Sequence, residues 1–437
     1  MKKTFMLASL IAMTDVASGT TGKVYLGTGT ESKFEKTIQE HKISESKIGT
    51  EVKVKDIGFS FGGEFKLKDV KGFIAAPSYA LATKDSNVWA KYELPEIKGI
   101  NSSIKATYKE TTKLNLEEDV NYTINGVKVG LNFNTTLPLK LEENKKLGEE
   151  TVSEHKLYVE AKEASVLKDV KANIKLVHTY NTIEKNAEAN EVLAKAIKNV
   201  SGEAEATYDK VKDLKLTGKV NFKRNINSDL KDEYKMLNYK LYAEAPIRYM
   251  HSYELNAEYT GIKHLTIMAK PFVAHFNGYK ISEDEKKNVI VYGSEFGAEY
   301  KMLNDKLTLT GKTLLAGRTS DVKFVSKIDD VKDRIKLTQG IFVFDVNVKY
   351  NYDVTNKFKV SPEANAYVSL VTYMQGKKRI VTPNLTLTPK VNAEYKPIEN
   401  LTLKGGVELP IEFGNVNSKF DYKSTTIKTS LNVEYKW

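Results

Sequence analysis

The stretch TTIKTSLNVEYKW, residues 425–437, decides the fold, because apolar and polar side chains alternate along it almost without a break. Leu431, Val433 and Tyr435 share one face, and Asn432 and Glu434 share the other. Successive side chains of a β-strand point to opposite faces of the sheet. The stretch therefore predicts a strand with one apolar and one polar face.

The same alternation recurs upstream, in residues 342–350, 358–370, 381–395 and 401–413. Several of these segments run for about 12 to 15 residues, whereas strands of globular proteins usually have about 5 or 6. A strand that crosses a membrane needs about 9 to 11 residues. A soluble sandwich would alternate too, but with shorter strands and a turn signal every 8 to 12 residues or so. The length of the segments favours membrane-spanning strands.

The connections between these segments alternate between short and long. Tight turns are predicted at residues 209–213, 260–264, 301–305, 353–357 and 396–400, with further turns near 66–72, 94–98, 124–126, 163–168 and 236–239. Longer polar stretches cover residues 281–288, 320–336 and 414–422. Short turns at one end and long loops at the other are typical of membrane barrels. The expected fold is all-β: a transmembrane antiparallel up-and-down β-barrel of about 18 to 22 strands, with 20 preferred.

Tyrosines recur at the end of strands that enter a short turn, and in the last strand. The six positions are Tyr208, Tyr259, Tyr300, Tyr350, Tyr395 and Tyr435. Tyrosine is stable at a membrane boundary, because its ring stays apolar while its hydroxyl stays wet. The alternative is that tyrosine is common in strands, but this predicts tyrosines anywhere along them. The tyrosines are predicted to form a girdle at one membrane boundary.

The N-terminal segment, residues 1–19, carries Lys2 and Lys3, then an apolar run, then small residues up to Gly19. This order predicts a secretory signal, with the barrel occupying residues 20–437; a buried N-terminal helix is the alternative. No other stretch approaches the roughly 18 apolar residues of a membrane-spanning helix. The chain has no cysteine, which excludes disulfides, thiolate zinc sites and a lipid-modified cysteine.

The net charge of +11 could indicate nucleic acid, but the excess is mainly lysine. Proteins that read bases favour arginine, and an exported chain rarely meets nucleic acid, so no nucleic-acid partner is expected. On the polar faces of the clearest strands, lysines and carboxylates occur in nearly equal numbers. The residues predicted to line a lumen are Lys349, Lys357, Lys359, Glu363, Lys390, Glu394, Lys404, Glu408, Glu412, Lys428 and Glu434.

Taken together, the signal segment, the alternation, the tyrosines and a terminal strand ending in Trp437 resemble the outer-membrane β-barrel proteins of diderm bacteria, porins in particular. The lysine-rich, arginine-poor style is similar to outer-membrane proteins of fusobacteria. The resemblance implies an outer-membrane location, surrounding lipid and a periplasmic tyrosine girdle. It also implies that Tyr435 and Trp437 form the signal recognised by the barrel assembly machinery.

One segment, residues 183–200, breaks the alternation and predicts a short helix in a long external loop. The loop could fold inward and narrow the lumen, which would place Lys185, Lys195 and Lys198 at a constriction. A surface decoration is the open alternative.

Catalysis is not predicted, because the six histidines show no metal-ligand spacing and no phosphate-binding glycine loop is present. No cofactor is expected. Alternation begins by about Val52, which disfavours the plug that precedes the barrel of iron-transport receptors. The favoured function is passive diffusion of small hydrophilic solutes or ions with weak selectivity. Adhesion through external loops is the alternative, and association into a homotrimer is left open.

Overall fold

The computed structural model describes residues 20–36, 39–69, 79–81, 86–109, 113–138, 152–167, 170–182, 197–225, 234–237, 239–242, 247–278, 288–325, 332–375, 378–416 and 419–437. Over these residues the chain is almost entirely β-strand, with a single turn of 3₁₀-helix, η1 (Lys55–Ile57). None of its described helices has the length and hydropathy to span a membrane. The expected signal, residues 1–19, lies outside the described residues.

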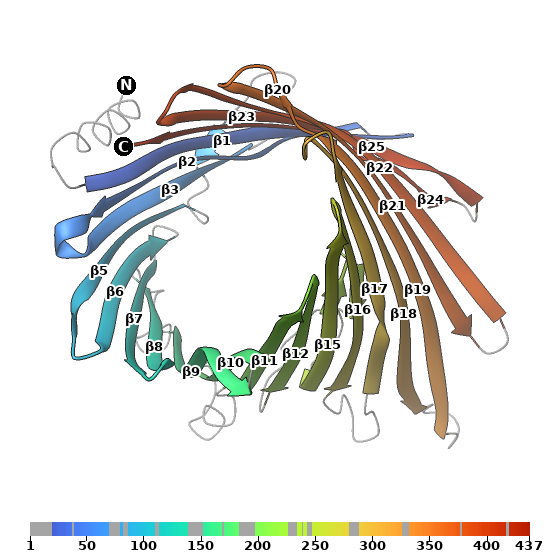
Figure 1. Cartoon of the computed structure of the whole chain (residues 1–437), viewed down its shortest axis with the longest axis horizontal. Coiled ribbons are helices and arrows are strands. Elements are labelled where there is room, and N and C mark those ends of the chain that lie inside the picture. The colour runs from blue at the N-terminus through green and yellow to red at the C-terminus, as the bar shows by residue number, and fades with distance from the viewer. Residues whose placement is uncertain are drawn as a thin grey trace, which may run out of the picture.

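The strands form one closed antiparallel barrel of 20 strands, as the sequence predicts (Figure 1). β23 and β24 share one position in the wall, because both pair with β22 and β25. The wall consists of β1 (Thr20–Glu35), β2 (Gln39–Val54), β3 (Phe59–Asp69), β5 (Asn87–Ile97), β6 (Ile100–Lys109), β7 (Lys113–Ile124), β8 (Val127–Pro138), β9 (Val152–Leu167), β10 (Val170–Thr182), β11 (Ile197–Val211), β12 (Leu214–Asn225), β15 (Ile247–Ile262), β16 (Leu265–Gly278), β17 (Asn288–Met302), β18 (Leu307–Val325), β19 (Lys332–Tyr350), β21 (Phe358–Gln375), β22 (Lys378–Ile398), β23 (Leu401–Glu408), β24 (Ile411–Val416) and β25 (Lys419–Lys436).

Four short strands complete the described structure. β4 (Tyr79–Leu81) pairs with the end of β3, and β20 (Tyr352–Asp353) pairs with the start of β21. β13 (Tyr234–Met236) and β14 (Tyr239–Tyr242) form a separate hairpin.

The barrel closes where the first and last strands meet. β1 and β25 pair from Lys23 opposite Lys436 to Glu35 opposite Ser424. The N–H of Gly22 donates to the carbonyl of Trp437 at 3.2 Å, and the N–H of Trp437 donates to the carbonyl of Gly22 at 3.1 Å. The indole ring lies so close over Gly22 that a Cβ there would be 2.2 Å from it. The terminal residue therefore seals the seam between the two strands.

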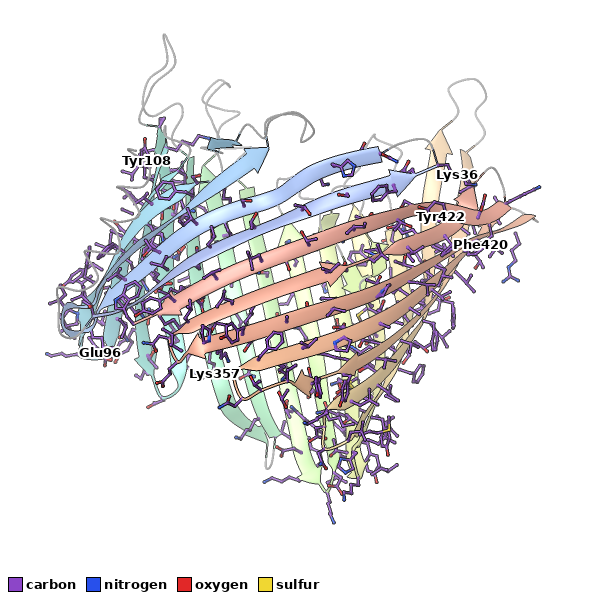
Figure 2. The ribbon with its side chains drawn as sticks, turned by 90° about the horizontal axis from the view of Figure 1, so that it is seen from above. Lys36, Glu96, Tyr108, Lys357, Phe420 and Tyr422 are labelled. Atoms are coloured by element: carbon purple, nitrogen blue, oxygen red, sulfur yellow. The ribbon has the colours of Figure 1, made fainter. Side chains whose placement is uncertain are left out.

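Most of the predicted short turns are confirmed, and they lie at the same end of the barrel as Trp437. Asn125 and Gly126, between β7 and β8, both have positive φ, which a two-residue hairpin of the favoured type requires. Glu96 and Lys357 mark this turn end in Figure 2, and Tyr108, Lys36 and Tyr422 lie toward the opposite, loop end.

Some boundaries were predicted wrongly. The first short turn is η1 rather than residues 66–72, of which 66–69 end β3 and 70–72 lie outside the described residues. The turn near 236–239 belongs to the β13–β14 hairpin instead of the wall. Residues 320–336 and 414–422 were expected to be loops, but strands extend from both sides into them. Their polar side chains gave a loop signal because strands that project beyond a membrane need no apolar face.

The wall is uneven in height. β5, β6, β7 and β8 have 11, 10, 12 and 12 residues, whereas β18 and β19 have 19 each and β22 has 21. Figure 1 shows the long strands together on one side of the ring. A strand of ten residues is just long enough to span a membrane, so the long strands project beyond it.

The concave face of the wall carries the polar side chains. The Tyr25 hydroxyl on β1 passes over Gly49 of β2 and donates to Glu64 on β3 at 2.7 Å. This hydrogen bond places Tyr25 and Glu64 on the polar face of the sheet. Tyr25 shares its face with Glu434 of the paired strand, whereas Tyr435 and Leu431 point outward and are exposed. The predicted orientation, apolar outside and polar inside, therefore holds along this part of the wall.

Candidate functional site: the inner wall

Charged side chains of alternating sign occupy one continuous row across seven strands of the inner wall. The strand register places these residues opposite one another in turn, and we name the row the charge ladder. Its members are Lys349, Glu363, Lys390, Glu408, Lys428, Glu31 and Lys42. Five of the seven are among the predicted lumen residues, but Glu31 and Lys42 were missed, because alternation near the N-terminus is less regular.

Three neighbouring pairs in the charge ladder form weak, solvated ion pairs. The Nζ atom of Lys428 lies 3.3 Å from a Glu408 carboxylate oxygen, and Nζ of Lys390 lies 4.0 Å from the other oxygen. The Nζ atom of Lys42 lies 2.9 Å from a Glu31 carboxylate oxygen. The side chains of these pairs keep between 26% and 61% of their surface accessible. Ion pairs this exposed add little stability, so their effect is on the electric field inside the barrel.

Two shorter rows repeat the arrangement. Lys359, Glu394 and Lys404 are opposite one another in turn, and Lys404 lies 3.1 Å from the Glu394 carboxylate. On the N-terminal side of the barrel, a row crosses β8, β9, β10 and β11 and contains Lys128, Glu160, Lys175 and Glu203. Alternation of sign is therefore a general property of the inner wall.

The remaining predicted lumen residues lie nearer the ends of strands. Lys357 lies in the turn before β21, where its Nζ donates to the Pro397 carbonyl at 2.7 Å, so it belongs to the rim. Glu412 on β24 accepts a hydrogen bond from Ser424 at 3.4 Å. Glu434 forms an ion pair with Lys436 at 2.7 Å.

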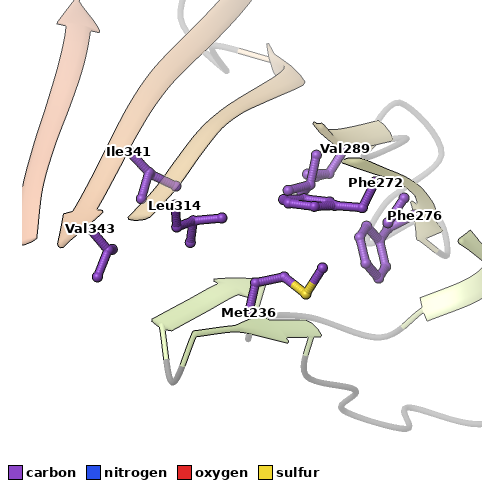
Figure 3. Packing of buried hydrophobic residues seen from close by; sticks show 9 residues of the cluster. Met236, Phe272, Phe276, Val289, Leu314, Ile341 and Val343 are labelled. Carbon is purple, nitrogen blue, oxygen red and sulfur yellow. The ribbon is translucent and has the colours of Figure 1, made fainter. Parts of the chain in front are cut away.

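A different surface covers the loop end of β16 to β19, where the inner face is apolar. Phe272, Ala274 and Phe276 share the inward face of β16 with Lys270, yet each is at most 5% exposed. They pack together with inward residues of the next three strands and with Met236 of the β13–β14 hairpin (Figure 3). We name this set the dry sector; its wall residues are Phe272, Ala274, Phe276, Val289, Val291, Leu314, Ile341 and Val343.

The β13–β14 hairpin is the element that makes the dry sector possible. Apolar side chains facing a water-filled lumen are unfavourable unless another apolar surface covers them, and Met236 and Leu237 supply part of that cover. The hairpin belongs to the connection between β12 and β15, which therefore folds inward. The sequence carries a signal for this arrangement, because VIVY at 289–292 and IFVF at 341–344 are apolar on both faces, as in strands buried on both sides.

Most of the segment predicted to form a constriction, residues 183–200, lies outside the described residues. Residues 197–200 belong to β11, and Lys198 pairs with Tyr180 of β10 through the backbone, so a helix extending to residue 200 is wrong. The strand pairing outweighs the good helix formers of this segment. Lys185 and Lys195 lie outside the described residues.

All six girdle tyrosines lie in the last few residues of strands at the turn end of the barrel. Tyr259, Tyr300, Tyr395 and Tyr435 are exposed on the outer face. Tyr350 stacks on Tyr352, with ring centroids 6.3 Å apart. Their positions suit a membrane boundary at this end.

Within the described residues, no three histidine, aspartate or glutamate side chains come together in a group that could hold a metal ion. Two histidines, His251 and His275, lie opposite each other on β15 and β16.

Comparison with known proteins supports the fold. No protein-family model matches the chain, and no curated protein matches it. Its structure is similar to the siderophore receptor PirA from Pseudomonas aeruginosa, with a TM-score of 0.52, 11% identity, and coverage of 96% of this chain and 80% of that one. Other similar structures are the FrpB iron transporter from Neisseria meningitidis (TM-score 0.48, 10% identity, coverage 97% and 82%) and OccAB3 from Acinetobacter baumannii (TM-score 0.44, 7% identity, coverage 96% and 99%). The protein thus has the fold of bacterial outer-membrane β-barrel proteins.

Proposed function

We propose that the protein is an outer-membrane porin, a water-filled channel through which small hydrophilic solutes and ions diffuse passively. The observation that carries the proposal is the solvent exposure of the charged inner wall. Side chains in a small, filled barrel would be buried against one another, whereas the inward ladder residues Lys390, Glu408 and Lys428 keep about a third or more of their surface accessible.

The charge ladder supports weak ion selectivity. Each lysine in the row is next to a carboxylate on the adjacent strand, so the fields of the two signs largely cancel a few ångströms from the wall. Charges at the mouths are screened over about 8 Å at physiological salt. The net positive charge of the chain therefore gives at most a mild preference for anions.

The β13–β14 hairpin narrows the lumen at one side. It lies against the dry sector of the wall, so solutes pass along the opposite, charged side. The constriction expected from Lys185, Lys195 and Lys198 is a separate prediction, and Lys185 and Lys195 lie outside the described residues.

The partners that follow are outer-membrane lipid, the permeating solutes and the barrel assembly machinery. The contact of Trp437 with Gly22 supports a role of the terminal strand in closing the barrel, and recognition of Tyr435 and Trp437 by the assembly machinery is part of the proposal. A homotrimer stays open, and adhesion would depend on external loops, most of which lie outside the described residues.

The test is the conductance of the purified, folded protein in a planar lipid bilayer. We expect stable steps of current in potassium chloride. In a salt gradient the reversal potential should be close to zero at high salt, and it should shift slightly toward the equilibrium potential of chloride at low salt. Heat-unfolded protein is the control. If protein that circular dichroism shows to be folded formed no channels, the proposal would be contradicted. A reversal potential close to the equilibrium potential of chloride at high salt would contradict weak selectivity.

A further inference from the structure

Two aromatic rings on the inner wall extend toward each other across glycines of neighbouring strands. Tyr25 of β1 lies over Gly49 of β2, where a Cβ would collide with its ring. Trp89 of β5 lies over Gly62 of β3, where a Cβ would be 2.9 Å from the indole. Gly49 is opposite Glu64, which is two residues from Gly62 in the same strand. The two rings therefore approach each other from opposite sides, over adjacent strands.

Both rings are on the lumen side of the wall. Tyr25 lies on the polar inner face, and the strand register puts Trp89 on the same face as Glu64. A ring that lies across a glycine has one face toward the backbone and the other toward the lumen. Ammonium groups reach both rings, since the Nζ atom of Lys47 is 5.7 Å from the centre of the Tyr25 ring and that of Lys105 is 5.3 Å from the centre of the Trp89 ring. Such contacts are weak at exposed sites, so a solute can displace them.

A cavity of about 210 Å³ lies between the two rings, and we name it the aromatic basin. Its lining includes both rings and the polar side chains of Lys23, Glu51, Glu64 and Asn87. The aromatic basin thus combines apolar ring faces with a rim of hydrogen-bonding groups.

The polar groups of the aromatic basin balance one another in charge. Glu51 forms an ion pair with Lys23 at 3.0 Å. Glu64 accepts a hydrogen bond from the Tyr25 hydroxyl at 2.7 Å and lies 3.3 Å from the Nζ atom of Lys47. An ionised carboxylate has about four acceptor positions, so both carboxylates can accept further hydrogen bonds. A charged ligand would have to break an existing ion pair, so the aromatic basin favours a neutral polar ligand.

The aromatic basin lies on the side of the lumen that the hairpin leaves open. β1, β2, β3 and β5 lie across the ring from β17, β18 and β19, which carry most of the dry sector (Figure 1). Solutes that pass along the charged side of the lumen therefore meet the aromatic basin.

We infer that the aromatic basin binds a sugar ring of a neutral carbohydrate. A pyranose has an apolar face of C–H groups, which packs on Trp89 and Tyr25, and a rim of hydroxyls, which bond to Glu51, Glu64 and Asn87. The inference rests on the proposed function, because the sugar reaches the aromatic basin through the open lumen.

The test is the fluorescence of Trp89 in the folded barrel in lipid vesicles. The chain has two tryptophans, so Trp437→Phe leaves Trp89 alone and keeps an aromatic ring at the terminal residue. We expect glucose to shift the emission to shorter wavelength, with a dissociation constant in the millimolar range, as suits an open site with few contacts. Sorbitol carries similar hydroxyls without a ring, and it should bind about threefold to tenfold more weakly because it has no flat face to stack.

Partial block of the ion current by glucose measures the same site in variants that lack this tryptophan. Trp89→Ala and Tyr25→Ala should each weaken the block about threefold to tenfold without closing the channel, and Trp89→Phe should keep part of it. The matched control is Tyr158→Ala. Tyr158 lies over Gly130 and donates to Asp119 at 3.1 Å in the same way, but on the described inner face of β7 to β10 no second aromatic ring lies beside it. This variant should bind glucose as the unaltered protein does.

The outcomes separate the inference from the proposed function. Channels that conduct ions but show neither a fluorescence shift nor a block with glucose would overturn the inference alone. A folded barrel that shows the shift but forms no channels would support the aromatic basin and contradict the proposed function. Equal binding of sorbitol and glucose would overturn stacking on the rings. Tighter binding of choline than of glucose would also overturn the inference, because the two rings would then bind a cation.

Discussion

The charge ladder and the dry sector occupy the same inner wall of one barrel, yet they differ in what covers them. Both sets of side chains point inward from long strands. The ladder residues face solvent and keep much of their surface exposed, whereas Leu314, Val291 and Val343 in the dry sector are fully buried. The difference lies in the β13–β14 hairpin, which excludes water from one part of the wall. An inward position in a barrel is therefore polar or apolar according to what packs on it.

The two surfaces also contribute differently to stability and function. Burying a large apolar side chain contributes about 1.5 to 3 kcal/mol, whereas an exposed ion pair contributes about 0 to 1 kcal/mol. The dry sector should thus fix the hairpin and the height of the wall, and the charge ladder should set the field in the lumen.

The largest effect is expected in the dry sector. Leu314→Ala should lower the free energy of unfolding by about 2 to 5 kcal/mol, because it leaves a cavity in a fully buried cluster. Leu315→Ala is the control on the same strand, since Leu315 faces outward and is 49% exposed, and it should cost clearly less. Urea unfolding in lipid vesicles measures both. Equal losses would show that the dry sector is not packed.

A second comparison sets the two faces of the charged wall against each other. Val407 is exposed on the outer face of β23, and Glu408 is the next residue, in the charge ladder. Val407→Arg should destabilise the barrel by about 2 to 4 kcal/mol, because it puts a cation into hydrocarbon. Glu408→Lys should leave the unfolding free energy within about 1 kcal/mol of the unaltered value. A reversed order would mean that the inside and outside faces have been exchanged.

The hairpin can be released without changing the wall. Met236→Glu puts a carboxylate against Phe272 and Phe276, which is unfavourable without a partner, so the hairpin should leave the dry sector. We expect a larger single-channel conductance from a barrel that still folds. Met236→Leu keeps the apolar contact and should conduct as the unaltered protein does. If both variants conducted alike, the hairpin would have no part in narrowing the lumen.

The smallest effect is expected from the charge ladder itself. Glu408→Lys places three lysines next to one another, with Lys390 and Lys428 on either side. The reversal potential should move by a few millivolts toward the equilibrium potential of chloride at low salt. The shift should be smaller at high salt, because salt screens the added charge. Glu96→Lys, in the last residues of β5 at the turn end, is a control for the same charge change away from the ladder. If both variants shifted the reversal potential equally, the charges at the mouths of the barrel, rather than the charge ladder, would set the ion selectivity.

Alternation with a period of two determined a large part of this protein from sequence alone. It predicted the strands and their two faces, because the direction of each side chain in a strand depends only on its position along the chain. The number of strands and the tyrosines at one end came from the positions of the short turns. The prediction from sequence failed at residues 197–200, which are strand although the residues just before them in the sequence are good helix formers.

Only the tertiary structure decided which residues are neighbours across strands. The charge ladder joins Lys428 to Glu408 and Glu31 through registers that depend on loop lengths and on closure of the barrel. The packing of Met236 on Phe272 likewise depends on an inward fold of one connection. A linear pattern shows which face a side chain takes, but contact between distant segments depends on the free energy of the whole closed sheet.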